Sequence, residues 1–282
     1  MEIIIIGGDR RMIFAAKKLA EQHDCALCGF EKAKVTGVLN IKGKARFGCA
    51  VLPIFARSEE IQCPYGDGNM DISVLTDYLE PGAAVFAGKV FPALEELCRT
   101  NGYELYDYLK REEFAVMNAV LTAEAAASIA VWETEHSVFG ADVLILGYGR
   151  IGKLTARYFS SLGAQVTAAA RKPCDIAWIK AQGCTAVDIT NERELTEALS
   201  KADIILNTVP AGIITGGRAE AVNREALLIE LASVPCTDGT AEFRVVNAGG
   251  LPGKTAPVTA GYIIAGTIEN IMDERRKQNG GA

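Results

Sequence analysis

The residues best suited to chemistry form a glycine-rich turn near the middle of the chain. Residues 142–152 read Asp-Val-Leu-Ile-Leu-Gly-Tyr-Gly-Arg-Ile-Gly, and apolar residues then recur at helical spacing. This order is typical of a dinucleotide-binding βαβ unit, in which Gly147 permits the tight turn, Gly149 leaves room for a pyrophosphate and Gly152 lets the helix approach the strand. The phosphates would meet free amides at the helix N-terminus. We therefore predict a bound dinucleotide; the alternative is a Rossmann-like scaffold that binds none.

The residues after the next predicted strand indicate which dinucleotide binds. An acidic residue about 20 positions after the fingerprint would hold the ribose 2′-hydroxyl of NAD. Here the strand 165–170 is followed by Arg171 and Lys172, and no carboxylate stands there. Because two cations suit the 2′-phosphate of NADP, we predict NADP as the cofactor. The alternative is that both residues are solvated loop charges.

Ligands of open α/β sheets bind beyond the carboxyl ends of the strands, which extends the predicted site to further loops. The strand 204–207 leads into Thr-Val-Pro, and the strand 227–231 leads into Ala-Ser. The predicted cofactor site comprises Gly147, Gly149, Arg150, Ile151, Gly152, Arg171, Lys172, Asn207, Thr208, Val209, Pro210 and Ala232.

The first half of the chain has a similar architecture without the complete glycine pattern. Residues 2–6 predict a buried parallel strand, and Gly-Gly-Asp-Arg-Arg at 7–11 precedes an amphipathic helix pattern and a second strand. This turn could bind a phosphate or an acid, or it could be a tight turn with solvated charges. Strands and helices alternate over roughly 110 residues, which indicates a parallel sheet in this half as well.

We predict an α/β fold of two Rossmann-like parallel-sheet domains joined by a long alanine-rich helix. Residues 1–121 would form a substrate-binding or catalytic domain, and residues 122–256 the NADP-binding domain. A C-terminal helix over 257–277 is expected to pack back on the first domain. The alanine-rich helix is expected to begin after Thr122 as its N-cap, with Glu124 in its first turn.

Composition narrows the possible partners and the location. The net charge is −6 and 49% of the residues are hydrophobic, which is typical of a soluble globular protein and gives no reason to expect a nucleic-acid or membrane partner. No apolar run is expected to approach a membrane span, and Glu2 directly precedes the apolar residues 3–6, unlike a signal peptide. The eight cysteines lack framework spacing, so we expect reduced thiols, no metal site and a cytoplasmic protein. Cys25 and Cys28 form Cys-x-x-Cys, but in a predicted strand that directs them to opposite faces.

The two-domain plan is similar to that of the D-2-hydroxyacid dehydrogenases, but the groups that their chemistry needs are missing. These enzymes use a histidine as general acid–base and an arginine that clamps the substrate carboxylate. The chain has only His23 and His136. The arginine would be expected after the strand 227–231, where Ala-Ser stands, and the histidine near Lys254. We therefore do not expect alcohol oxidation through a histidine.

A second, ordered set of motifs runs along nearly the whole chain. It consists of Gly7-Gly8-Asp9 with Arg11, Asn118 with Thr122-x-Glu124, Leu146-Gly147-x-Gly149-Arg150-x-Gly152, Ala170-Arg171, Asn207-Thr208-x-Pro210, Leu231-Ala232-Ser233-x-Pro235 and Leu251-Pro-Gly253-x-x-Ala256-Pro257-x-Thr259-Ala260-Gly261. In these motifs the chain resembles the A subunit of dipicolinate synthase, an enzyme of bacterial spore formation. One departure concerns the loop after Pro235, where Cys236 and Thr237 replace glycines of the family.

This resemblance implies that dihydrodipicolinate is oxidised to dipicolinate with NADP, in the mother cell of a sporulating bacterium and together with a flavoprotein-like B subunit. The substrate is a cyclic dicarboxylate, so its site needs cations. The predicted substrate-binding residues are Arg11, Lys89 and Lys254, and the predicted catalytic residues, as orienters or proton acceptors, are Asn118, Glu124 and Ser233. For Glu124 the alternative is a role limited to complementing the helix dipole.

We also expect a homo-oligomer. Two other functions stay open at this point. One is an NADP-dependent enzyme that acts on another small carboxylate or imine, and the other is a non-catalytic NADP-binding protein that regulates a partner.

Overall fold

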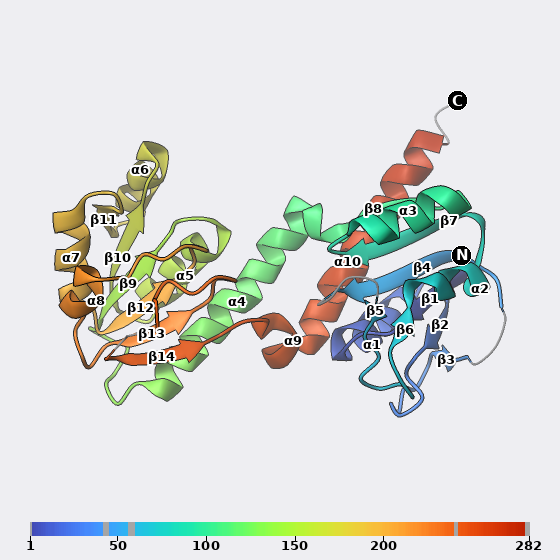
Figure 1. Ribbon diagram of the computed structural model, residues 1–282, viewed down its shortest axis with the longest axis horizontal. Helices are drawn as coiled ribbons and strands as arrows, with labels where there is room; N and C mark the ends of the chain where they lie inside the picture. The colour runs from blue at the N-terminus through green and yellow to red at the C-terminus, as the bar shows by residue number, and fades with distance from the viewer. Residues whose placement is uncertain (1, 42–44, 56–59, 240–241, 280–282) are drawn as a thin grey trace. The chain divides into compact units, whose positions relative to one another are not determined.

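The chain folds into two compact units, each with its own parallel sheet (Figure 1). Unit 1 consists of residues 1–118 with 256–282, and unit 2 of residues 119–255. The computed structural model describes residues 2–41, 45–55, 60–239 and 242–279.

Unit 1 is built on a six-stranded sheet in the order β3-β2-β1-β4-β7-β8, with every pair parallel. Its strands are β1 (Glu2–Ile6), β2 (Asp24–Cys28), β3 (Leu39–Asn40), β4 (Phe47–Ile54), β7 (Leu79–Gly88) and β8 (Glu104–Asp107), and a separate antiparallel pair is formed by β5 (Glu60–Ile61) and β6 (Met70–Asp71). The isoleucines of β1 are fully buried because both faces of the sheet are covered. Ile3 and Ile5 join one hydrophobic core, and Ile4 and Ile6 join the other.

The C-terminal helix belongs to unit 1, as the sequence predicted. The helices of this unit are α1 (Arg10–Leu19), α2 (Leu75–Tyr78), α3 (Pro92–Asn101) and α10 (Pro257–Asn279), with single 3₁₀ turns η1 (Ile72–Val74) and η2 (Tyr108–Lys110). Helix α10 packs closely on α1. The close approach depends on Gly261, because a Cβ atom there would lie 2.4 Å from the carbonyl oxygen of Arg11.

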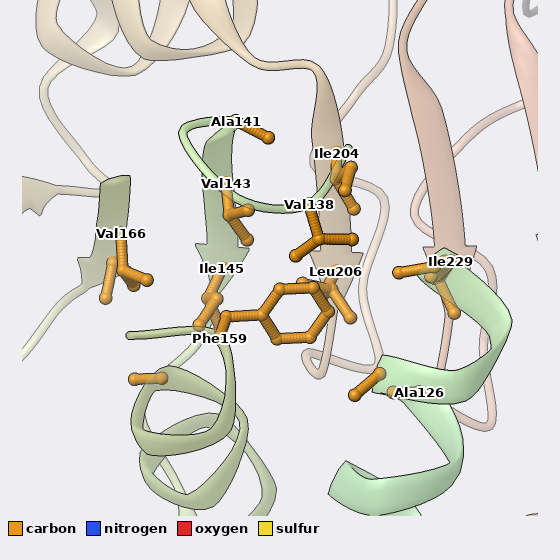
Figure 2. Packing of buried hydrophobic residues seen from close by; sticks show 14 of the residues in the cluster. Ala126, Val138, Ala141, Val143, Ile145, Phe159, Val166, Ile204, Leu206 and Ile229 are labelled. Carbon is orange, nitrogen blue, oxygen red and sulfur yellow. The ribbon is translucent and has the colours of Figure 1, made fainter. Parts of the chain in front are cut away.

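Unit 2 has the second six-stranded parallel sheet, in the order β11-β10-β9-β12-β13-β14. Its elements are β9 (Asp142–Leu146), α5 (Arg150–Ser161), β10 (Gln165–Ala170), α6 (Pro173–Ala181), β11 (Thr185–Asp188), α7 (Glu192–Lys201), β12 (Ile204–Asn207), α8 (Gly217–Ala221), β13 (Leu227–Glu230), β14 (Arg244–Asn247) and α9 (Leu251–Thr255). The Phe159 ring of α5 lies among Val138, Ile145 and Leu206 on one face of this sheet (Figure 2). The predicted fold class is confirmed.

The helix that links the units, α4 (Glu112–Glu133), is longer than predicted. Phe114 packs into the core of unit 1, whereas Ala126 and Ala130 pack into that of unit 2. The predicted N-cap at Thr122 is therefore wrong: this residue lies in mid-helix and is buried. The helix begins earlier because the Phe114 side chain is already buried against unit 1 and the acidic residues Glu112 and Glu113 occupy the true first turn.

By length and composition alone, helix α4 is long and apolar enough to cross a membrane, contrary to the expectation that no apolar run approaches a membrane span. Half of its most apolar window is buried inside the protein, a property that core helices of soluble proteins share.

Candidate functional site

The glycine fingerprint forms a tight turn directly after β9. Gly147 has a φ of +94°, and a Cβ atom on it would lie 2.5 Å from Oγ1 of Thr208. A Cβ atom on Gly152 would lie 2.2 Å from the carbonyl oxygen of Gly147, so only glycine allows α5 to begin this close to the turn. Both glycines thus have the steric roles that the fingerprint assigns to them.

Gly149 differs from the other two glycines because nothing in the described structure requires it. Its backbone is extended, and a Cβ atom would meet no other atom within 4 Å. It is the N-cap of α5 and has no side chain that could accept hydrogen bonds from the first amides of the helix. The open space and the lack of a capping side chain at Gly149 fit a phosphate group at the start of α5.

Arg171 and Lys172 follow the carboxyl end of β10, beside the fingerprint strand. Both side chains are exposed. Among the described residues neither side chain forms a hydrogen bond or an ion pair, whereas Arg218 and Arg244 of the same unit are each paired with a glutamate. Two cations therefore stand free, within the described part of the chain, where an anionic group could be bound.

The loop after β12 is held against the fingerprint turn. The Thr208 hydroxyl donates to the carbonyl oxygen of Leu146 at 2.8 Å, and the Thr208 amide donates to the same oxygen at 2.9 Å. Val209 also packs against the turn, since a Cβ atom on Gly147 would lie 2.7 Å from its Cγ2. Pro210, the next residue of the loop, is exposed.

Asn207 and Glu230 form a buried polar contact that the sequence did not predict. Asn207 is fully buried, and its Nδ2 donates to Oε1 of Glu230 at 2.6 Å and to the carbonyl oxygen of Val209 at 3.0 Å. The same Glu230 carboxylate accepts from the amides of Ala232 and Cys236 at 3.1 and 2.8 Å. The Asn207 side chain thus helps to hold the loop after β12, and its contact with the cofactor stays a prediction. In the sequence, Glu230 could have been noticed as a single charged residue at the end of an apolar strand.

The predicted residues after β13 lie on the loop that Glu230 holds. Ala232 is half-buried, and Ser233 next to it is exposed. Cys236 fits where the family has glycine: it is fully buried, its φ is not positive, and its carbonyl oxygen accepts from the amides of Ile213 and Ile214 at 3.0 and 2.9 Å. Cys236 therefore occupies its place in the loop without a left-handed backbone.

Two further predicted residues of unit 2 are exposed. Lys254 lies on α9, and its Nζ donates to the carbonyl oxygen of Gly249 at 2.9 Å. Glu124 lies in the middle of α4 with its side chain exposed. The alternative in which Glu124 complements the positive end of the helix is wrong, because that end is at Glu112, about three turns away.

In unit 1 the predicted residues lie on separate elements. Arg11, in the first turn of α1, binds Asp9 with Nε and Nη2 at 2.9 and 2.8 Å. Lys89 follows β7 and has the only positive φ, +64°, among the described non-glycine residues. The carboxylate of Asp107 accepts from the Lys89 amide at 3.3 Å and so helps to hold this conformation. Asn118 is half-buried on α4 and makes interactions there.

The cysteines of unit 1 are buried or half-buried. Cys25 and Cys28 pack into cores on opposite faces of the sheet, as predicted for i and i+3 in a strand. Burial raises the pKa of Cys25 to about 12 and that of Cys49 to about 11, so both stay protonated at neutral pH. Among the described residues no cluster of histidine, cysteine and carboxylate side chains could hold a metal ion.

The fold and the glycine turn define a dehydrogenase-like protein with an NAD(P)-binding domain. Residues 114–253 match the family described as D-isomer specific 2-hydroxyacid dehydrogenase, NAD binding domain. Residues 2–109 match the N-terminal domain of the dipicolinate synthase A subunit.

Full-length relatives give the same assignment. The chain is 28% identical to the dipicolinate synthase A subunit of Bacillus subtilis (strain 168), with 99% of this chain and 98% of the relative covered. The crystal structure of the Bacillus subtilis A chain matches with a TM-score of 0.85 at 27% identity, covering 99% and 97% of the two chains. That of the A subunit from Bacillus halodurans matches with a TM-score of 0.84 at 26% identity, covering 96% and 97%. The chain belongs to the family of dipicolinate synthase A subunits.

Proposed function

We propose that this chain binds NADP and oxidises dihydrodipicolinate to dipicolinate as the dehydrogenase component of a dipicolinate synthase. The proposal is supported above all by the cations Arg171 and Lys172, which have no partner among the described residues and stand beside an open glycine turn. They favour NADP because its additional 2′-phosphate carries close to two negative charges that NAD lacks.

The remaining predicted residues fit the needs of a dicarboxylate substrate. Arg11, Lys89 and Lys254 would bind its two carboxylates, Arg11 through the part of its guanidinium group that Asp9 leaves unbonded. Bound NADP supplies the acceptor for the hydride. The oxidation also releases one proton, and the exposed carboxylate of Glu124 is the proposed acceptor, with Asn118 and Ser233 orienting the ring.

The two histidines support a chemistry without a histidine base. His23 precedes the amino end of β2, and its Nε2 lies 2.9 Å from Oε1 of Glu269. His136 precedes the amino end of β9. Ligands of parallel sheets bind at the opposite, carboxyl edge, so neither histidine lies on the edge where a substrate would bind in its own unit. Aromatisation of the ring supplies driving force, which reduces the demand for a strong base.

We further propose that the protein acts in the cytoplasm of the mother cell, as a homo-oligomer and together with a flavoprotein-like B subunit. Membership of a family of A subunits implies a partner, and unit 2 has surface that could serve one. Val131, Trp132 and Phe139 are exposed by 59, 86 and 76%, which is unusual for large apolar side chains in one short segment.

The decisive experiment measures product. The purified chain is mixed with NADP and an enzymatically generated dihydrodipicolinate precursor, with and without the B subunit, and dipicolinate is followed by its absorbance. We expect product in at least one mixture and less with NAD in place of NADP. Absence of product from both mixtures, while NADP still binds, would point instead to a non-catalytic role or to another small carboxylate or imine as substrate.

A further inference from the structure

Glu230 is a buried carboxylate at the carboxyl end of β13, and the function proposed above does not use it. It is 4% exposed. Its two oxygens accept three N–H groups, from Asn207 Nδ2 at 2.6 Å and from the amides of Ala232 and Cys236 at 3.1 and 2.8 Å. Among the described residues no lysine, arginine or histidine forms an ion pair with it.

The surroundings of Glu230 suit the ionised form. A protonated carboxyl group would need an acceptor for its own hydrogen, but each of these three partners is a donor. Burial raises the pKa of the neighbouring Cys236 thiol, and Glu230 adds to this effect. A buried charge without a cation is unfavourable unless something compensates it, so such a charge calls for an explanation.

The strand order places this charge on one side of the cofactor site. Arg171 and Lys172, the proposed partners of the adenosine 2′-phosphate, follow β10 on one side of the fingerprint strand β9. A dinucleotide that crosses the sheet at β9 must extend its other half over β12 and β13, which lie on the opposite side. Asn207 and Glu230 end these two strands.

We propose that Glu230 is a charge-bearing positioning residue of the nicotinamide half of the site. Through Asn207 and the amides of Ala232 and Cys236 it holds the loops after β12 and β13. Its negative charge favours the oxidised nicotinamide ring, which is a cation, over the reduced ring, which is neutral. The inference rests on the proposed NADP cofactor. It adds that the site discriminates between the two redox forms.

The test compares binding of NADP⁺ and NADPH to wild type and to Glu230→Gln, by calorimetry or by quenching of intrinsic fluorescence. Glutamine keeps the size and one acceptor oxygen but removes the charge. A loss of loop position would weaken both forms alike, whereas loss of the charge weakens NADP⁺ selectively. We expect NADP⁺ affinity to fall about tenfold more than NADPH affinity, the effect of one charge acting through a partly solvated site. This corresponds to an increase of about 30 mV in the midpoint potential of the bound two-electron couple.

A matched control is Glu225→Gln, the same change in an exposed residue close to the amino end of β13. It should leave the ratio of the two dissociation constants unchanged. Equal losses of NADP⁺ and NADPH affinity in Glu230→Gln, or an unchanged ratio, would overturn the charge proposal. If wild type binds neither form, the proposed cofactor itself is wrong, so the two failures can be told apart.

Should Glu230→Gln fail to fold, the wild type alone decides. The proposal requires it to bind NADP⁺ more tightly than NADPH. Tighter binding of NADPH would refute it.

Discussion

Gly149→Ala tests whether a glycine of the fingerprint is needed for the packing of the protein itself or for the space that a ligand occupies. At Gly147 and Gly152 an added Cβ atom would lie 2.5 and 2.2 Å from existing atoms, so alanine must distort the protein itself. At Gly149 it would meet nothing within 4 Å, and the φ of −78° is available to any residue. The group that an alanine at this position would obstruct is therefore a ligand.

The expected magnitudes follow from this difference. In Gly149→Ala the loss of a favourable N-cap and the gain from a less flexible unfolded chain are each on the order of 0.5 kcal/mol and oppose one another, so stability should stay within about 1 kcal/mol of wild type. Displacing a phosphate from one or two charge-assisted hydrogen bonds at the start of α5 costs about 2–3 kcal/mol, or roughly 30- to 150-fold in NADP affinity.

The assay combines thermal unfolding with titration of NADP into wild type, Gly149→Ala and Gly152→Ala. We expect Gly149→Ala to unfold at nearly the wild-type temperature and to bind NADP weakly. Gly152→Ala should lose both stability and binding, because its Cβ atom collides with backbone. Wild-type NADP affinity in a folded Gly149→Ala variant would refute the placement of the phosphates at this turn.

Three further predictions address the 2′-phosphate, the proton acceptor and the packing of α10. Arg171→Asp should weaken NADP binding about 100-fold and NAD binding less than about threefold, because a cation is replaced by an anion opposite a group that only NADP has; equal effects in titrations with both would show that this cation does not select the cofactor. Glu124→Gln should slow turnover at least about tenfold and, because the side chain is exposed, should not change the unfolding temperature. The control Glu135→Gln, also at an exposed residue, should leave the turnover rate unchanged. An unaffected rate in Glu124→Gln would leave Glu124 without a proposed role. Gly261→Ala should destabilise the protein by about 2 kcal/mol in chemical unfolding, because its Cβ atom would lie 2.4 Å from the carbonyl oxygen of Arg11, and wild-type stability would mean that α10 can move away from α1.

Local signals explain which parts of the fold could be predicted. The apolar runs of β1 and β9 each end in glycines with positive φ, and such strand–turn boundaries are encoded within a few residues. The start of α4 was missed because Thr122 and Glu124 have the residue types of a cap. Burial of Phe114 in unit 1 extends the helix to Glu112, and that packing depends on residues far away in the sequence.

The site shows the same limit. The fingerprint glycines and the cations after β10 could be found because their roles depend on short spacing. Glu230 could not, since its meaning comes from Asn207 on the neighbouring strand and from the amide of Cys236. The sequence of one strand does not show that hydrogen-bond donors from a neighbouring strand or loop will bind its buried charge.

The two units also explain why the same sheet order yields a predicted dinucleotide site in only one of them. In unit 1 the turn after β1 ends in Asp9, whose carboxylate accepts from the Arg11 amide at 3.0 Å and binds the Arg11 guanidinium group. The N-terminus of α1 is thus capped by the chain's own anion, and a Cβ atom on Gly8 would lie 2.4 Å from Met12, so no open space precedes the helix in this described segment. In unit 2 the corresponding cap is Gly149, with no carboxylate and with open space in front of it. A phosphate would compete with Asp9 in unit 1 but meets no such competitor at Gly149. The capping residue, more than the sheet, therefore favours unit 2 for the dinucleotide.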